Sequence, residues 1–139
     1  MRAILLIMIW SALLHAELTR DATTGIVSDS ATGLQWQDDE VGDEATWEDA
    51  IDRCETLTLG GYNDWRLPNI NELKSIIDRS KVDPAIKDGF ENVSSCNYWS
   101  STTSDEYRHG AWRVVFSDGR VYFYDKDSNY YVRCVRAGE

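Results

Sequence analysis

Histidine is scarce in this 139-residue sequence, which contains two, and only His109 lies outside the first sixteen residues. A serine nucleophile would need His109 beside Ser100 or Ser101, and neither serine lies in the glycine-flanked sequence of a nucleophile elbow. A hydrolytic metal site usually needs three protein ligands, which one histidine and scattered carboxylates do not supply. We therefore expect no catalytic residue, no metal site and no cofactor, and we interpret His109 as a surface-loop residue.

Basic residues are also few. The chain has 14 Lys and Arg against 24 Asp and Glu, for a formal net charge of −10. An acidic chain repels phosphate backbones unless its basic residues gather on one face. We therefore expect no nucleic-acid partner.

Long hydrophobic runs are missing as well. The longest, Ala3 to Leu14, has 12 residues, follows Arg2 and ends near the small residue Ala16. A membrane-spanning helix needs about 20 apolar residues, whereas a short apolar run between a basic start and a small residue is typical of a signal peptide. We expect a signal peptide over residues 1–16, a secreted or periplasmic chain that does not span the membrane, and one domain over residues 17–139.

The three cysteines, Cys54, Cys96 and Cys134, allow three pairings with one thiol left over. Cys54 falls on the apolar face of a predicted helix, and Cys134 lies in the middle of a predicted final strand. A bond between these two would tie the helix to the sheet and close a long loop, which is stabilising. We therefore favour Cys54–Cys134, with Cys96 free.

Two helices are predicted in the first half of the chain. In the first, Trp47, Ala50, Ile51, Cys54 and Leu57 share one face, Thr46 is the expected N-cap, and Gly60-Gly61 is the expected stop. The second begins after Asn69, which has the spacing of a capping box with Glu72. Its apolar stripe is Ile70, Leu73, Ile76 and Ile77.

Strands are predicted on both sides of these helices. Turns that end in glycine predict a hairpin of residues 26–28 and 34–36. After an irregular stretch over 80–95, aromatic and β-branched residues predict a closing antiparallel sheet. The order is α+β, with two helices packed on an antiparallel sheet and an N-terminal β-hairpin. The strands of the closing sheet are expected at 98–102, 111–117, 120–126 and 130–136.

Five sequence blocks carry a resemblance to a known family: "TGLQWQ", "TWEDAIDRCE", "GGYNDWRLPNINELKSIID", "YWSSTT" and "YVRCVR". Together they resemble the bacterial domain of unknown function 1566, also called the C-terminal domain of the Legionella collagen-like protein, over about residues 20 to 137. The resemblance implies a fold similar to C-type lectins and to the formylglycine-generating, sulfatase-modifying fold. In C-type lectins a first-helix cysteine also bonds one in the final strand.

The resemblance further implies an extracellular module that binds glycans or a cell-surface protein. In the collagen-like adhesin the domain is a trimer that binds sulfated glycosaminoglycans. This chain departs from that adhesin because it lacks a collagen Gly-X-Y repeat and is strongly acidic. The oligomeric state is therefore left open, with a trimer as what the family implies.

The stretch "YNDWRLPNINEL", residues 62–73, allows two interpretations. As a calcium site it departs from the lectin pattern, because Leu67 precedes Pro68 and Asn63-Asp64 comes before the proline. As a scaffold, Trp65 and Leu67 would fill the core and Arg66 would pair with a carboxylate. We favour the scaffold and keep calcium as the alternative. The loop that begins at Asp125 also departs from an EF-hand, because Tyr130 stands where glycine is needed.

Alternation along the closing strands predicts a recognition surface. If Trp112, Val114, Phe116 and Cys134 face the core, the residues between them face outward. Tyrosine rings stack on sugars, and arginine binds carboxylate or sulfate. The alternative is that loop 80–95 covers this face as a second core. The predicted ligand-binding residues are Arg113, Tyr122, Tyr124, Tyr131 and Arg133.

These observations favour a secreted, non-enzymatic, C-type-lectin-like binding module. One alternative is an enzyme related to the formylglycine-generating fold. The other is a structural subunit of a surface assembly, joined through Cys96.

Overall fold

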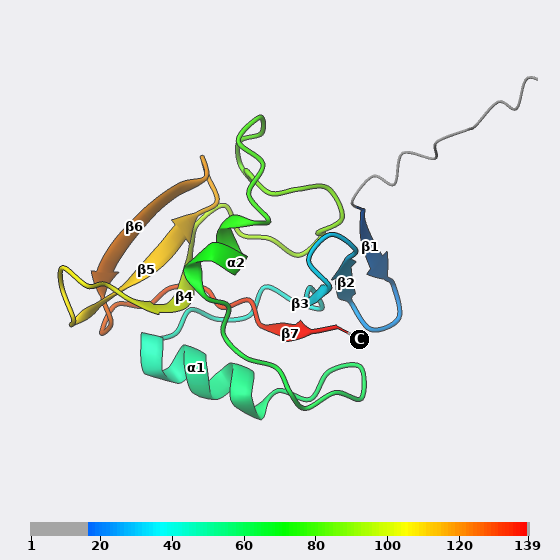
Figure 1. The fold of residues 1–139 in the computed structure, drawn as a ribbon, viewed down its shortest axis with the longest axis horizontal. Helices are drawn as coiled ribbons and strands as arrows, with labels where there is room; N and C mark the ends of the chain where they lie inside the picture. The colour runs from blue at the N-terminus through cyan, green and yellow to red at the C-terminus, as the bar shows by residue number, and fades with distance from the viewer. Residues whose placement is uncertain (1–16, 139) are drawn as a thin grey trace, which may run out of the picture.

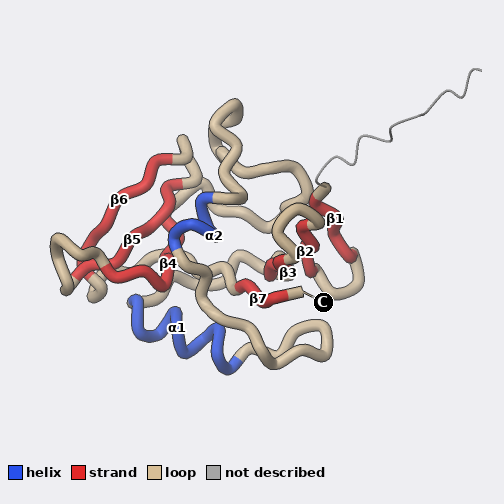
Figure 2. Tube along the Cα trace, in the orientation of Figure 1, coloured by secondary structure: helices blue, strands red, loops and turns tan. Residues whose placement is uncertain are grey.

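The computed structural model describes residues 17–138, so the expected signal peptide lies outside the described residues. Figure 1 shows two antiparallel sheets and two short helices, which confirms the α+β class. Figure 2 shows how much of the chain between them is loop. In chain order the elements are β1 (Leu18–Asp21), β2 (Ile26–Asp29), β3 (Leu34–Gln37), α1 (Trp47–Thr56), α2 (Ile70–Lys74), β4 (Asn97–Thr103), β5 (Gly110–Val115), β6 (Arg120–Asp125) and β7 (Val135–Ala137).

The first sheet has the strand order β1-β2-β3-β7. The predicted hairpin is confirmed as β2 and β3, with Val27 opposite Trp36 and both side chains buried. Gly25 and Gly33 close the turns before these strands with φ of 71° and 72°, a region that glycine enters at little cost. Strand β1 was not predicted from the sequence. It pairs with β2 and forms one edge of this sheet.

The second sheet has the order β4-β5-β6 and contains three of the four predicted closing strands. The fourth prediction, a continuous strand over 130–136, is wrong. Tyr130 forms a bridge with Ala45 and Tyr131 one with Tyr98, whereas Val135 pairs with Trp36 of β3. The segment therefore crosses from the second sheet to the first, and it cannot keep the side-chain alternation of a single strand.

Helix α1 forms where the apolar stripe predicts it. Thr46 caps its first turn by accepting a hydrogen bond from the Asp49 N–H, as expected for this residue type at an N-cap. The helix ends at Thr56, earlier than the glycine pair suggested, because Leu57 is already extended with ψ of 131°. Ala50 and Cys54 of its stripe are buried.

Helix α2 has five residues, and its capping box is formed as predicted. The Asn69 side chain accepts from the Glu72 N–H, and the Glu72 carboxylate accepts from the Asn69 N–H at 3.0 Å. Reciprocal capping satisfies two backbone donors at a helix start. The irregular stretch predicted for 80–95 is also present, with neither helix nor strand.

Two hydrophobic clusters lie on opposite faces of β4. Trp99 belongs to the cluster that contains α1 and the disulfide, and its neighbour Tyr98 to the cluster that contains α2. Ile86 and Phe90 from loop 80–95 pack with Tyr98 and Val114, on the face opposite to Arg113. The alternative interpretation required loop 80–95 to cover the face that carries Arg113. The loop instead covers the opposite face, which carries Val114.

Candidate functional site

The outer half of the β5–β6 pair presents half-exposed tyrosines. Arg113 of β5 lies opposite Tyr122 of β6, and Ala111 lies opposite Tyr124, so these side chains share one face. The exposed fractions of Tyr122 and Tyr124 are 44% and 51%, among the largest of any apolar or aromatic side chain in the described chain. Toward β4 the same face is closed by Trp99. This face is therefore buried at β4, where Trp99 lies, and exposed at β6, where Tyr122 and Tyr124 lie.

Arg113 holds this surface together. Its guanidinium carbon lies 5.7 Å from the Tyr122 ring centre, 5.6 Å from that of Tyr124 and 4.9 Å from that of Tyr130. Contacts of this length are attractive cation–π interactions. We call Arg113, Tyr122, Tyr124 and Tyr130 the tyrosine–arginine face.

Arg113 keeps unused hydrogen-bonding capacity. Its Nη1 donates to the Asn97 side-chain oxygen. Its buried Nε has no hydrogen-bond acceptor among the described residues. A buried unpaired donor costs free energy, so its presence needs an explanation. Trp36 Nε1 and Arg133 Nε are buried and unpaired in the same way, so the Arg113 Nε does not by itself mark a ligand site.

Tyr130 is the member of the face that the sequence analysis missed. It comes from the loop after β6, and its ring packs against Trp99 with centres 4.7 Å apart. No local pattern marks its contact with Arg113, because the two residues meet only when the 126–134 segment folds back across the sheet.

Two of the predicted site residues lie elsewhere, and the outward placement of Arg133 is wrong. Only 2% of Arg133 is exposed, and its Nη1 donates to Asp38 Oδ1 at 3.0 Å. Tyr131 is partly buried in the α2 cluster, with its ring 5.5 Å from that of Tyr98. The physical reason is the crossing of 130–134 between sheets, which breaks the alternation that the prediction assumed.

Asp38 is the centre of a buried polar network. Its carboxylate accepts from Arg20 Nε at 2.7 Å, from the N–H groups of Glu91 and Asn92 at 2.9 and 3.1 Å, and from Arg133. A buried carboxylate is tolerated when its lone pairs are filled and an opposite charge is close. The network joins the first sheet, loop 80–95 and the C-terminal segment, so we assign it a structural role.

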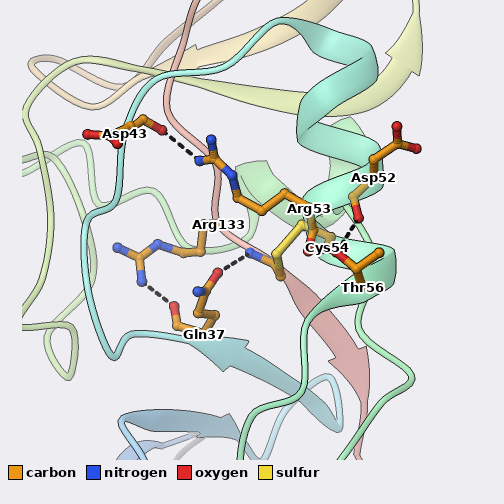
Figure 3. Close-up of a disulfide and its surroundings, with 8 residues drawn as sticks. Gln37, Asp43, Asp52, Arg53, Cys54, Thr56 and Arg133 are labelled. Carbon is orange, nitrogen blue, oxygen red and sulfur yellow. Dashed lines mark hydrogen bonds between the residues drawn. A yellow bond between two sulfur atoms is a disulfide. The ribbon is translucent and has the colours of Figure 1, made fainter.

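The disulfide forms between Cys54 and Cys134, as the sequence analysis favoured (Figure 3). Beside it, Gln37 accepts from the Cys134 N–H at 3.2 Å, and Arg53 donates to the Asp43 carbonyl at 2.6 Å. Cys96 is free and exposed. A depression of about 360 Å³ lies in this region, apart from the tyrosine–arginine face, and is lined by Gln37, Glu40, Val41, Gly42, Asp43, Arg53 and Val132.

The 62–73 stretch is built as a scaffold. Trp65 and Leu67 are buried in the α1 cluster. Arg66 donates two hydrogen bonds to the Glu72 carboxylate at 2.6 and 2.7 Å, which lowers the pKa of Glu72 below its usual 4.5. Asp64 accepts from the buried Arg136 at 2.7 Å, and this bond lowers the pKa of Asp64. Both carboxylates of the stretch are therefore bound to arginines.

The residues considered for chemistry are placed as follows. His109 is exposed, with its ring 5.7 Å from that of Tyr107. The Ser100 hydroxyl is buried and donates to the Trp112 carbonyl at 2.7 Å. Among residues 17–138, no group of three or more His, Cys, Asp or Glu is arranged to hold a metal ion. Within the same range, no helix has both the length and the apolar character needed to cross a membrane.

Comparison with protein families gives one match. The sequence model described as the Lcl C-terminal domain matches residues 25–136, which is most of the described chain. The matched range includes both helices, both partners of the disulfide and all four residues of the tyrosine–arginine face. No curated protein matches the chain.

Proposed function

Because the chain belongs to the Lcl C-terminal domain family, we propose that it is a secreted, non-enzymatic, C-type-lectin-like binding module. Its ligand is a glycan or a cell-surface protein. The ligand rests on the tyrosine–arginine face and needs neither a cofactor nor calcium.

One observation carries this proposal: two half-exposed tyrosine rings flank a guanidinium, whose carbon lies 5.7 Å from the Tyr122 ring centre and 5.6 Å from that of Tyr124. Tyrosine is a rigid amphipathic side chain that contacts a flat ligand at low entropic cost. Because the rings already pack around Arg113, little ordering is needed when a ligand binds.

Charge and shape limit what this face can accept. The guanidinium favours a ligand with an oxygen acceptor, such as a hydroxyl, carboxylate or sulfate. The rings favour a flat apolar patch beside that acceptor, which a pyranose ring or a peptide side chain provides. The acidic balance of the whole chain, −10, weakens the attraction for highly charged polyanions.

Secretion is supported by the disulfide. Disulfides persist in oxidising compartments and are rare in the reducing cytosol. The bond between Cys54 and Cys134 therefore favours an extracellular or periplasmic site, in agreement with the signal peptide expected from the sequence.

A structural subunit held through Cys96 is the second candidate, because that thiol is free and exposed. In an oxidising compartment such a thiol is available to pair with another chain. The enzyme alternative has less support, since the formylglycine-generating enzymes depend on active-site cysteines and two of the three here are bonded to each other.

A glycan and cell-surface-protein array tests the proposal. We expect the chain to bind a defined set of ligands without added calcium, and Tyr124→Ala to lose at least about tenfold in affinity, as expected for a central aromatic contact. Tyr62→Ala is the matched control, because Tyr62 is a 38% exposed tyrosine that packs on Arg136, away from the face. Equal binding by both variants would contradict the proposed site.

A further inference from the structure

A small cavity lies on the outer side of the first sheet. Its volume is about 180 Å³, and its polar lining comes from Asp21 at the end of β1, Thr24 in the turn after β1, Ser28 of β2, Gln35 of β3 and the loop residue Tyr62. Cavities that hold drug-sized ligands are larger, at about 300–1,000 Å³. The volume therefore suits a single small ring.

Strand pairing places most of this lining. Ser28 lies opposite Gln35, and Gln35 lies opposite Arg136 of β7. Residues directly opposite each other on antiparallel strands have their side chains on the same side of the sheet. Asp21 lies opposite Ile26, two residues before Ser28, so it belongs to the same side. The cavity is therefore built on the regular part of the sheet.

A chain of hydrogen bonds leads to the cavity and leaves a donor there. Arg136 Nη1 donates to Gln35 Oε1, and Gln35 Nε2 donates to Ser28 Oγ at 3.1 Å. Ser28 Oγ accepts in this bond, so the hydrogen of its own hydroxyl needs another acceptor. None of the residues 17–138 provides one. The Ser28 hydroxyl therefore keeps a donor for a ligand in the cavity.

Thr24 and Asp21 add a second donor and an acceptor. Thr24 Oγ1 accepts from the Ile26 N–H at 3.3 Å, and its hydroxyl hydrogen has no acceptor in the described chain. Asp21 Oδ1 accepts from the N–H groups of Thr23 and Thr24 at 2.8 and 3.2 Å. Asp21 Oδ2, in contrast, has no hydrogen bond and no ion pair with any described residue. The cavity thus offers two hydroxyl donors and one carboxylate acceptor.

Tyr62 supplies an aromatic wall. Its ring centre lies 3.6 Å from the Arg136 guanidinium carbon, and Arg136 is held by Asp64 Oδ1 at 2.7 Å. The ring is still 38% exposed. Because the ring is already packed on a buried side chain, little ordering is needed when a ligand contacts it. The wall offers an apolar contact to the C–H groups of a ligand.

The donors and the acceptor together restrict the chemistry of the ligand. An ammonium group only donates, so it would leave the hydroxyl hydrogens of Ser28 and Thr24 without an acceptor. A carboxylate or sulfate only accepts, and Asp21 repels it. A hydroxyl group both donates and accepts. We propose that the cavity binds one ring of a neutral saccharide, whose neighbouring hydroxyls donate to Asp21 and accept from Ser28 and Thr24.

This cavity is separate from the tyrosine–arginine face. It lies on the first sheet, whereas the face lies on the second sheet, toward the other end of the molecule (Figure 1). The charged side chain of the cavity lining is Asp21, whereas the face contains Arg113. Tyr62→Ala should weaken a saccharide bound in the cavity and spare a ligand of the face, and Tyr124→Ala should do the reverse. The cavity therefore stands or falls independently of the proposed function.

NMR titration of the labelled chain with the methyl glycosides of glucose, galactose and mannose tests the inference. We expect at least one glycoside to cause saturable shift changes at Thr24, Ser28 and Gln35. The matching methyl uronide, which carries a carboxylate in place of the hydroxymethyl group, should bind about threefold or more weakly at low ionic strength, because Asp21 repels it. Absence of saturable changes at these residues with all three glycosides, or equal or tighter binding of the uronide, would overturn the proposal.

Two variants then test the named contacts. Asp21→Asn removes the charge and one acceptor, and it keeps an oxygen for the N–H groups of Thr23 and Thr24. We expect the dissociation constant of the glycoside to rise about fivefold or more and the preference over the uronide to disappear. Asp105→Asn is the matched control, because Asp105 is exposed in the loop between β4 and β5. Ser28→Ala should weaken binding by a similar factor. Unchanged affinity in either variant, shown to be folded by circular dichroism, would contradict the site.

Discussion

Asp38 and Arg133 form an ion pair inside the protein, with Arg133 Nη1 3.0 Å from Asp38 Oδ1 and side-chain exposures of 0% and 2%. The pair joins the end of β3 to the segment that crosses between the sheets. Because neither group reaches solvent, the Arg133 charge depends on Asp38 for compensation, whereas Asp38 is also paired with Arg20 at 2.7 Å. The relative position of the two sheets therefore depends on a polar contact as well as on apolar packing.

Asp38→Ala is expected to lower the free energy of unfolding by about 3–5 kcal/mol, because it leaves Arg133 buried and uncompensated. Urea unfolding at neutral pH measures the change. Asp88→Ala is the matched control, since Asp88 pairs with Lys81 in an exposed position. The control should change stability by less than about 1 kcal/mol. Similar losses in both variants would contradict the structural role of Asp38.

Removing the disulfide should destabilise the fold. Cys54 and Cys134 are 80 residues apart, and the chain-entropy estimate for a loop of this length is about 4–5 kcal/mol. The Cys54→Ser/Cys134→Ser variant should lose about this amount in urea unfolding, whereas Cys96→Ser should change stability by about 0.5 kcal/mol or less. Peptide mapping without reductant that found Cys96 in the native bond would contradict this arrangement.

Thiol labelling gives a separate prediction. The native, unreduced chain should take up one maleimide, at Cys96, because that residue is exposed and the other cysteines are bonded. Mass spectrometry of the labelled peptide identifies the position. Absence of labelling together with a reducible dimer would support the structural-subunit alternative instead.

The Arg66–Glu72 pair predicts a contribution to acid sensitivity. The hydrogen bond from Arg66 lowers the pKa of Glu72 below 4.5 in the folded state, so folding favours the ionised carboxylate. The resulting stability is fully present above the unfolded pKa and is lost as the pH falls through the lower folded value. Urea unfolding between about pH 6 and pH 2 should show a smaller decrease in stability for Glu72→Gln than for the parent chain. Parallel curves would contradict this linkage.

Local features of this fold could be predicted from the sequence. Thr46 and the Asn69–Glu72 box fix helix starts through contacts a few residues apart, and the glycines before β2 and β3 fix turns in the same way. The disulfide was also predicted, from the place of Cys54 on a clear helical stripe, although the strand expected to carry Cys134 is not formed there. Cys134 lies in the crossing segment just before β7 and is buried.

The sequence could not predict which strands or loops a segment contacts once it leaves a helix or strand. Residues 130–136 have strand composition, yet they cross between two sheets, so Arg133 is buried where alternation placed it outside. The same crossing brings Tyr130 to Arg113. Composition reports the preference for extended backbone, whereas the partner of each extended residue is decided by tertiary packing.

The most direct test of the account maps a ligand found on the array by NMR chemical-shift changes in the labelled chain. The account predicts that the largest changes fall on Arg113, Tyr122, Tyr124 and Tyr130. Changes centred instead on Gln37, Asp43 and Arg53, which line the depression near the disulfide, would contradict it.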